Sequence, residues 1–374
     1  MTEHANETNA TDETAQGRLL GAADIRRIAA EAGISPTKKF GQNFVIDPGT
    51  VRRIVREAGV TADDHVLEVG PGLGSLTLAI LETGATMTAV EIDPPVAERL
   101  PGTIAEFMPD AVDRFRVVNR DALTVTPENL PDFQNDDSFT LVANLPYNVA
   151  TPILLTLLER FDNLGTFLVM VQKEVADRLS EKPGSKIYGT PSVKLAWYGT
   201  AERVGIIGRN VFWPAPNVDS ALVLFKRYEG GHTPSANNPD GSVVDRENVF
   251  RLIDAAFGQR RKTLHAALKK IVPSEAFEQA GIDPTRRGET LAIDEFVALA
   301  RAVGRCRKHE RHQYRNQHGQ RGLPGENESD PARRQATQRM GWPTRARHHL
   351  LRRRRVRHRH HQSQKARIRF LPES

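Results

Sequence analysis

The chain has 374 residues, enough for about two domains, and its 39% hydrophobic and 6% aromatic content is low for a chain that is folded throughout. The single cysteine, Cys306, excludes a disulfide framework and a multi-cysteine metal site, and no apolar run approaches the roughly 18 residues of a membrane helix. The net charge of +6 is uneven, because residues 304–374 hold 20 basic and 5 acidic residues and leave 32 basic and 41 acidic residues elsewhere.

The N-terminal third begins with two predicted helices. Residues 1–17 are polar and acidic and lack both apolar periodicity and the apolar core of a signal peptide, so we expect a disordered leader on a cytoplasmic protein. Amphipathic spacing predicts one helix from Gly21 and a second from Asp47, with a polar loop at 35–39 between them.

Strands and helices alternate after the second helix. Strands are predicted at His65–Val69, Met87–Ile92, Phe115–Asn119, Leu141–Leu145, Phe167–Val171, Val204–Ile207 and Ala221–Phe225. Helices are predicted at Leu76–Leu81 and Thr151–Glu159. Continuous apolar strands that alternate with helices predict an α/β fold with a parallel sheet covered on both faces, and the last two strands predict an antiparallel edge.

The composition changes after Tyr228. Residues 230–244 are rich in Gly, Pro and Asn and are interpreted as a linker between a first domain at 18–229 and a small helical domain at 245–303. From Gly304 the apolar pattern stops, so 304–374 is predicted to be a basic disordered tail. Three interpretations of this tail compete: an RNA-binding arm, an inert extension, and translation after a frameshift, which its Arg/His/Gln-rich composition favours.

A glycine-rich turn, Glu68-Val69-Gly70-Pro71-Gly72-Leu73-Gly74, joins the first strand to its helix. Glycines at such a turn let a ligand approach the backbone, and the helix N-terminus offers unpaired N–H groups. The spacing G-x-G-x-G after an acid is more typical of S-adenosylmethionine than of NAD.

Two acids follow neighbouring strands of the predicted sheet. Glu91 ends the second strand, where its carboxylate can accept both hydroxyls of an adenosine ribose, and this function is favoured over a solvated surface acid. Asp121 follows the third strand and can accept a hydrogen bond from an adenine amino group. For Asp121 the alternative of a helix N-cap is equally good.

Asn144-Leu145-Pro146-Tyr147 follows the fourth strand and is the most specific motif. The amide oxygen of Asn144 and neighbouring carbonyls can accept both N–H groups of an exocyclic amine, which directs the nitrogen lone pair at an electrophile. Tyr147 offers an aromatic face on which an extruded base can stack. A structural strand-end turn is the alternative.

With these motifs, residues 18–303 resemble the ribosomal RNA adenine dimethyltransferases and are most similar to the members that act on small-subunit rRNA. The matching stretches are Lys39–Asp47, Glu68–Gly74, Val90–Asp93, Asp121-Ala122, Asn144–Tyr147, Phe212–Ser220 and Phe257–Leu264. The resemblance implies a Rossmann-like class I S-adenosylmethionine-dependent methyltransferase fold with a small helical C-terminal domain.

The resemblance also implies the site and the substrate. The cofactor S-adenosylmethionine would be bound by Asn43, Val45, Gly70, Glu91, Asp121 and Asn144, with Asn144 and Tyr147 as the catalytic residues. Val45 stands where the family usually has Leu. The implied substrate is the small-subunit rRNA in the immature 30S subunit, dimethylated at N6 of two adjacent adenosines near its 3′ end by a monomeric cytoplasmic enzyme.

Basic residues in the predicted helical domain are candidate RNA contacts. Arg260, Arg261 and Lys262 stand together in an otherwise acidic body, and phosphate contacts need only a local positive field. A solvated helix face is the alternative. No metal site is expected, although Cys306, His309 and His312 have a metal-like spacing.

Three other functions compete with this one. A large-subunit rRNA methyltransferase of the macrolide-resistance type shares the glycine loop and the Asn144–Tyr147 motif, but the Gln259–Leu264 stretch favours the small-subunit enzyme. A non-catalytic ribosome-assembly factor is disfavoured by the intact motif, although both functions can coexist. An NAD-dependent oxidoreductase is disfavoured by the spacing of the glycines.

Overall fold

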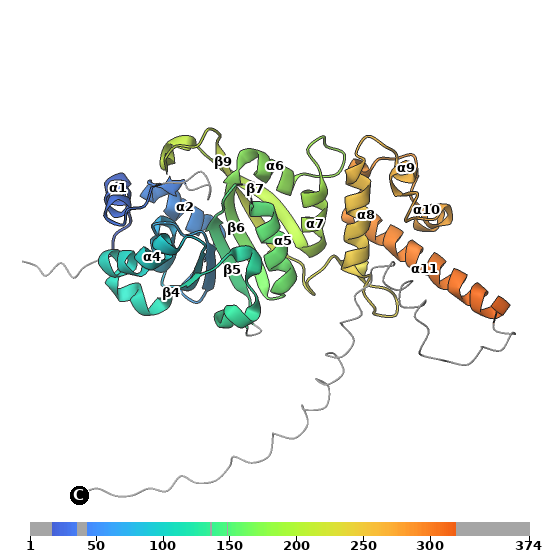
Figure 1. The fold of residues 1–374 in the computed structure, drawn as a ribbon, viewed down its shortest axis with the longest axis horizontal. Coiled ribbons are helices and arrows are strands. Elements are labelled where there is room, and N and C mark those ends of the chain that lie inside the picture. The colour runs from blue at the N-terminus through green and yellow to red at the C-terminus, as the bar shows by residue number, and fades with distance from the viewer. Residues whose placement is uncertain (1–16, 36–42, 135–136, 148, 319–374) are drawn as a thin grey trace, which may run out of the picture. The chain divides into compact units, whose positions relative to one another are not determined.

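The computed structural model describes residues 17–35, 43–134, 137–147 and 149–318, with backbone alone from 310 onwards (Figure 1). The strands are β1 (Phe44–Val45), β2 (His65–Val69), β3 (Thr86–Glu91), β4 (Phe115–Asn119), β5 (Phe139–Asn144), β6 (Leu164–Gln172), β7 (Gly199–Ile207), β8 (Phe212–Trp213) and β9 (Ser220–Arg227). The helices are α1 (Ala22–Glu31), α2 (Pro48–Ala58), α3 (Ser75–Glu82), α4 (Pro94–Phe107), α5 (Ala150–Arg160), α6 (Lys173–Ser180), α7 (Thr190–Tyr198), α8 (Arg246–Gly258), α9 (Leu264–Leu268), α10 (Ser274–Ala280) and α11 (Ile293–His318).

The central sheet has the strand order β4-β3-β2-β5-β6-β9-β7. The strands from β2 to β6 are mutually parallel where they pair, and β9 is antiparallel to both β6 and β7. The predicted parallel sheet is confirmed. The predicted antiparallel pair also forms, from β7 and β9. Strand β9 is antiparallel to both of its neighbours and lies next to the edge, and β7 forms the edge itself.

The strand order reverses between β2 and β5. From β2 the chain proceeds outward to β3 and β4, and it then returns to the other side of β2 to form β5 and β6. Connections on the two sides therefore diverge at the carboxyl ends of β2 and β5 and leave a crevice there, which is where open α/β sheets bind ligands.

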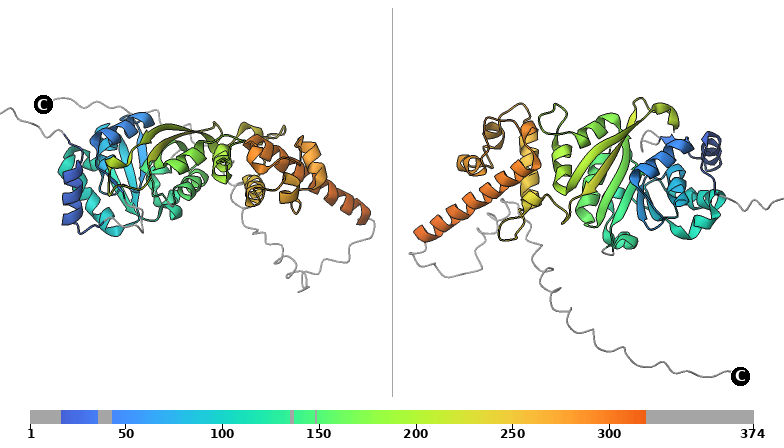
Figure 2. Two further views of the ribbon diagram at one scale, coloured as in Figure 1. Left: turned by 90° about the horizontal axis from the view of Figure 1, so that it is seen from above. Right: turned by 180° about the vertical axis from the view of Figure 1, so that it is seen from behind.

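Helices cover both faces of the sheet, as the views from above and behind show (Figure 2). Successive residues of a strand belong to opposite hydrophobic clusters: Leu141 and Ala143 face the cluster that includes α5 and α7, while Val142 faces the one that includes α1 to α4. Because a strand buried on both faces has no polar alternation, these segments appear in the sequence as continuous apolar runs.

The polar capping of α2 shows why the chain folds locally as predicted. Asp47 precedes the helix, and its carboxylate accepts from the Thr50 amide at 2.7 Å and from the Thr50 hydroxyl at 2.6 Å. Pro48 occupies the first turn, where its missing N–H costs nothing, and Gly59 ends the helix in the left-handed region at φ 71°.

The predicted linker at 230–244 is packed in the structure. Thr233 and Ala236 are buried, and the Thr233 hydroxyl donates to Asp294 of α11 at 2.8 Å. Buried residues of α8 to α11 and of the sheet form one continuous hydrophobic cluster through α7. The division into domains at 18–229 and 245–303 therefore stays a prediction, and the leader at 1–17 lies, except for Gly17, outside the described residues.

The prediction that regular structure ends at Gly304 is wrong. Helix α11 continues through Gly304 to His318, and Cys306 packs against the hydrophobic cluster. The apolar period fades there because the following residues are Arg, Lys, His and Gln, but most of these are adequate helix formers and no proline interrupts them. The remainder of the predicted tail, from 319, lies outside the described residues.

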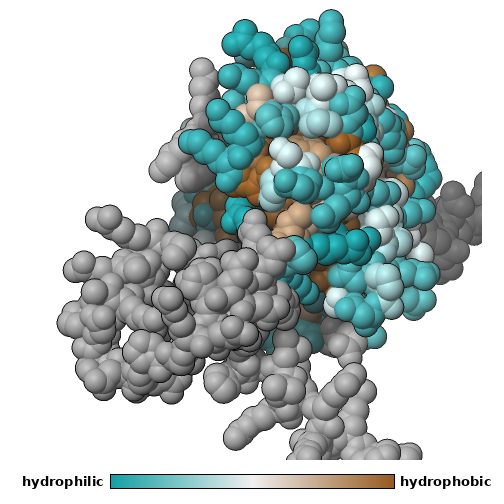
Figure 3. Space-filling model, turned by 90° about the vertical axis from the view of Figure 1, so that its right-hand side faces the viewer, coloured by the Kyte–Doolittle hydropathy of each residue, from teal (hydrophilic) through white to brown (hydrophobic). Residues whose placement is uncertain are grey.

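The described residues up to Glu310 form one compact unit. The face on the side of α8 to α11 is mainly hydrophilic, with apolar patches between the polar side chains (Figure 3). Within the part of the chain that the structure describes, no helix has the length and apolar character needed to cross a lipid bilayer.

Candidate active site

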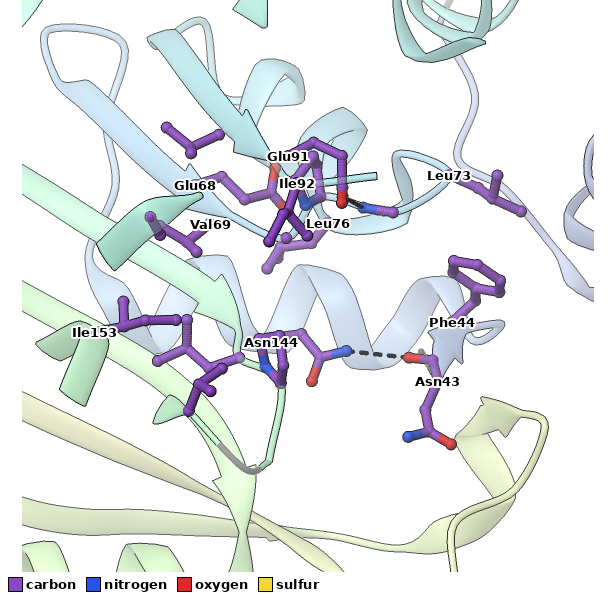
Figure 4. Close-up of a pocket in the computed structure, with 18 of the residues that line it drawn as sticks. Asn43, Phe44, Glu68, Val69, Leu73, Leu76, Glu91, Ile92, Asn144 and Ile153 are labelled. Atoms are coloured by element: carbon purple, nitrogen blue, oxygen red, sulfur yellow. Dashed lines mark hydrogen bonds between the residues drawn. The ribbon is translucent and has the colours of Figure 1, made fainter. Parts of the chain in front are cut away.

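A pocket opens at the crevice between the carboxyl ends of β2 and β5 (Figure 4). It brings together every residue that the sequence predicts for cofactor binding and for catalysis: Asn43, Val45, Gly70, Glu91, Asp121, Asn144 and Tyr147. It also contains residues that the motif analysis did not assign, among them Phe44, Ser75, Ile92 and Arg120.

The glycine loop forms one wall of the pocket in a backbone conformation that requires glycine. Gly70, Gly72 and Gly74 have φ values of 71°, 57° and 99°. A Cβ on Gly72 would also lie 2.9 Å from the ring of Phe44, so the loop needs glycine there for space as well.

Glu91 lies at the end of β3 and points at the glycine loop (Figure 4). Its carboxylate accepts from the amides of Gly72 at 3.3 Å and Asp93 at 3.0 Å, and the residue is 5% exposed. Burial raises the pKa of Glu91, and these two amide bonds oppose that rise. Each oxygen of an ionised carboxylate keeps further lone pairs, so Glu91 can still accept two hydroxyl donors.

The structure confirms the capping alternative for Asp121, and the adenine contact stays a prediction. Its Oδ1 accepts from the Leu123 amide at 2.9 Å and so caps the short 3₁₀ turn Ala122–Thr124. The residue also lines the pocket. Capping occupies one oxygen, which leaves the second available to a ligand.

A hydrogen bond between two segments far apart in the sequence fixes the amide of Asn144. Its Nδ2 donates to the carbonyl oxygen of Asn43 at 3.2 Å (Figure 4). Because the nitrogen is engaged there, the amide oxygen is directed away from Asn43, and Asn144 lines the pocket. This orientation presents an acceptor to a ligand at the carboxyl end of β5.

The segment that carries Asn43 and Val45 is held over the pocket by three contacts. β1 pairs antiparallel with β8, which sets Phe44 opposite Trp213, and the two rings stack with centroids 6.3 Å apart. The Ser75 hydroxyl donates to the Val45 carbonyl at 2.6 Å. Ser75 directly follows the glycine loop in the sequence. This position at the start of a helix is the only sequence signal that could have identified Ser75 as a residue of the site.

Tyr147 forms the wall of the pocket beyond Asn144. Its hydroxyl lies 3.1 Å from that of Ser220 at the start of β9. This bond fixes the ring without occupying its face. The carbonyl of Pro146 accepts from the Val149 amide at 3.2 Å, so this one carbonyl of the motif is already engaged.

Glu68 is a buried acid below the glycine loop. It is 1% exposed, and its Oε2 accepts from the Thr77 hydroxyl at 2.7 Å. Burial, reinforced by the nearby charge of Glu91, raises the pKa of Glu68 to about 8 against the opposing Thr77 hydrogen bond. At neutral pH Glu68 is therefore mainly protonated, and Glu91 is the carboxylate better placed to bind a polar ligand.

The predicted RNA contacts lie outside the pocket, and Arg260 is engaged within the chain. Its Nε forms an ion pair with Glu289 at 2.7 Å, and its guanidinium also donates to the Lys186 carbonyl. Arg261 and Lys262 are exposed. Among the described residues no group of three His, Cys, Asp or Glu side chains could hold a metal ion, and His312 lies where no side chain is described.

Known protein families and curated proteins include relatives of this chain. The family model for ribosomal RNA adenine dimethylase matches residues 35–303. A Bifidobacterium adolescentis protein named ribosomal RNA small subunit methyltransferase A is 92% identical over 303 residues, which cover 81% of this chain and 98% of that protein. A protein of the same name from Thermobifida fusca is 55% identical and covers 77% of this chain and 97% of its own length.

Two solved structures have a similar fold. The dimethyladenosine transferase from Plasmodium falciparum has a TM-score of 0.55 at 22% identity. The similar region covers 68% of this chain and 95% of that protein's chain. The 23S rRNA methyltransferase ErmE has a TM-score of 0.50 at 24% identity. The similar region covers 70% of this chain and 100% of the ErmE chain. Both support a methyltransferase fold for the sheet and its helices.

The protonated state of Glu68 makes stability depend on pH. The folded chain keeps this proton up to about pH 8, whereas the unfolded chain loses it near 4.5, so stability falls as the pH rises between these values. Glu68→Gln keeps the bond to Thr77 and cannot ionise. We expect its Tm to match that of the wild type at pH 5 and to exceed it at pH 9.

Thermal unfolding between pH 5 and 9 measures this difference. Glu98→Gln, an exposed position on α4, is the control and should follow the wild-type curve. If the curves for Glu68→Gln and the wild type remain parallel over the whole range, Glu68 is ionised in the folded protein.

Proposed function

Because the chain belongs to the ribosomal RNA adenine dimethylase family, we propose that it transfers methyl groups from S-adenosylmethionine to N6 of two adjacent adenosines near the 3′ end of small-subunit rRNA. The observation that carries this proposal is the amide of Asn144, which the Asn43 carbonyl orients inside the pocket at the strand-order reversal. The enzyme acts as a monomer in the cytoplasm on the immature 30S subunit and contributes to its biogenesis.

The choice of the small subunit is supported by the relatives. Proteins that are 52% to 92% identical to this chain carry the name ribosomal RNA small subunit methyltransferase A. The large-subunit alternative shares the glycine loop and the Asn144–Tyr147 motif, but the 23S rRNA methyltransferase ErmE is only 24% identical to this chain and supports the fold alone. Mass spectrometry of small-subunit rRNA after incubation with labelled S-adenosylmethionine tests the function directly, and unlabelled rRNA would exclude it.

The pocket residues fit S-adenosylmethionine. Glu91 offers a carboxylate for the two ribose hydroxyls, and the second oxygen of Asp121 can accept from the adenine amino group. Asn43 and Val45 cover the pocket, and Gly70 permits close approach of the ligand to the backbone. When bound, S-adenosylmethionine supplies an electrophilic methyl group on a sulfonium.

Asn144 prepares the target amine for attack. Its amide oxygen accepts one N–H of the exocyclic amine and directs the nitrogen lone pair toward the methyl donor. No strong base is required, because the amine proton becomes acidic once the nitrogen is cationic and passes to water. The pocket must also accept a monomethylated amine, since each adenosine receives two methyl groups.

Tyr147 holds the extruded adenine by stacking. Its ring, fixed through Ser220, presents an aromatic face next to Asn144. Outside the pocket, Arg261 and Lys262 are exposed cations suited to phosphate contacts, whereas Arg260 pairs with Glu289 and acts through its position in the fold.

Glu91→Ala should weaken cofactor binding more than folding. The loss of two charge-assisted hydrogen bonds at about 1.5–3 kcal/mol each reduces affinity by well over tenfold. Isothermal titration with S-adenosylmethionine measures this, with Tm to verify folding. Glu98→Ala is the matched control, and an unchanged affinity in folded Glu91→Ala would refute the ribose contact.

Asn144→Ala should remove most turnover and spare RNA binding, because the lost oxygen acts mainly in the transition state. Tyr147→Ala should instead reduce occupancy of the flipped base by about 1–3 kcal/mol, the contribution of one base–aromatic stack. Tyr147→Phe keeps the ring and loses only the bond to Ser220, so its effect should be small.

Single-turnover methylation with saturating small subunits separates the two functions. We expect saturation to restore the rate of Tyr147→Ala and not that of Asn144→Ala. If Asn144→Ala reaches a near wild-type rate at saturation, the lone-pair mechanism is wrong.

Removal of residues 319–374 should leave methylation of small subunits intact. The family match ends at 303 and α11 ends at His318, so this truncation preserves both. The KM for small subunits at moderate salt, compared with that of the full chain, measures the effect. A rise of tenfold or more would identify the tail as an RNA-binding arm and exclude the frameshift interpretation.

A further inference from the structure

A second groove lies one strand beyond the candidate target-base site. Its residues come from the end of β6, from α6, from the loop before α7 and from the segment between β7 and β9: Gln172, Lys173, Glu174, Asp177, Ile187, Arg209, Asn217, Val218 and Asp219. Gln172 pairs with Ser220, whose hydroxyl holds Tyr147 at 3.1 Å. The groove and the target-base site are therefore neighbours along one edge of the sheet.

Two aliphatic side chains in this groove are exposed. Ile187 is 41% exposed and Val218 is 46% exposed, and they come from segments 31 positions apart in the sequence. Scattered exposed aliphatic residues are common on protein surfaces and need no explanation. Here the two line the same groove, which gives it an apolar surface suited to the face of a base.

The fold holds Ile187 in place from both sides. The Gly184 amide donates to the Glu289 carbonyl at 2.8 Å, and the Tyr188 hydroxyl donates to the Leu291 carbonyl at 2.9 Å. Arg260 adds a bond to the Lys186 carbonyl. The helical region thus supports the loop that carries Ile187. Arg260 contributes to this support through its bond to the loop, which gives it a function within the fold.

Most charges around the groove are already paired. Asp177 pairs with Lys173 at 2.6 Å and with Arg203. Glu174 pairs with Arg178 at 2.9 Å.

Arg209 differs from these paired groups. Its guanidinium donates to the Asn217 carbonyl at 3.3 Å, a bond that does not neutralise its charge. It is exposed and available to an anion. The remaining carboxylate, Asp219, can accept a hydrogen bond from a ribose 2′-hydroxyl, a group that DNA lacks.

We propose that this groove binds the nucleotide next to the target adenosine in the RNA strand, with its base against Ile187 and Val218 and its phosphate against Arg209. The proposal rests on the proposed function, because an RNA strand whose one base occupies the pocket must continue along the adjoining surface. An aliphatic surface requires no N–H donor from the base, so it accepts a neighbouring adenine before and after dimethylation.

Val218→Asp and Arg209→Gln test the groove by steady-state methylation of small subunits. We expect Val218→Asp to raise KM between about fivefold and 100-fold, the range for the loss of one base contact. Arg209→Gln should raise KM and make its salt dependence shallower, as the loss of a phosphate contact does. The single-turnover rate at saturation and the affinity for S-adenosylmethionine should stay within about twofold of the wild type.

The controls are Val243→Asp, which is 47% exposed and lies in a different segment, and Arg26→Gln on the exposed face of α1. Both should leave KM unchanged. If Val218→Asp also leaves KM unchanged while wild-type enzyme labels the rRNA, the groove proposal is wrong and the proposed function stands. If wild-type enzyme labels no rRNA, both fail.

Reconstituted small subunits with an abasic residue beside the target adenosine identify the occupant. An abasic neighbour should raise the wild-type KM and should raise that of Val218→Asp no further, because the contact is already lost. If the abasic residue and Val218→Asp instead raise KM independently, so that their effects add, the groove binds another part of the subunit and the proposal is overturned.

Discussion

The reversal of strand order between β2 and β5 is the constraint on which the site depends. Parallel strands end at one edge of the sheet, and the reversal sends their connections apart, so a pocket forms there. Glu91 ends β3, Asp121 follows β4 and Asn144 ends β5, and the three residues meet at this edge because the strands are parallel. The helices on both faces bury the strands and fix these strand ends in place.

The N-terminal segment around β1 completes the site through contacts outside the main sheet. β1 and β8 form a separate two-stranded pair, and Ser75 ties the Val45 carbonyl to the start of α3. This arrangement brings the Asn43 carbonyl to the amide of Asn144, which fixes the side chain that we propose acts on the target amine. The carboxyl edge of the sheet supplies hydrogen-bond acceptors, and the N-terminal segment orients one of these acceptors, the amide of Asn144.

Hydrogen bonding distinguishes two buried acids at the site. Glu68 and Glu91 are both buried acids near the glycine loop, but Glu91 accepts from two backbone amides, which favour its ionised form, whereas Glu68 accepts from a single hydroxyl. The pKa of each is raised by burial, that of Glu68 to about 8. The site therefore has one carboxylate that can serve a ligand and one acid that serves the fold.

The sequence by itself determined the order of the seven strands of the main sheet, because buried strands are continuous apolar runs, and it predicted helices whose ends carry their own signals, such as Asp47 and Gly59 of α2. It did not predict β1, β8, α4, α6 or α7. Most residues of the candidate site could also be predicted from the sequence, because they lie in short motifs at strand ends, whereas Asn43 and Val45 were implied only by the family resemblance. Only the tertiary structure decided which segments meet: the pairing of Phe44 with Trp213, the bond from Asn144 to Asn43, and the engagement of Arg260 by Glu289. These contacts join residues 29 to 169 positions apart in the sequence, and neither periodicity nor local propensity carries information over such separations.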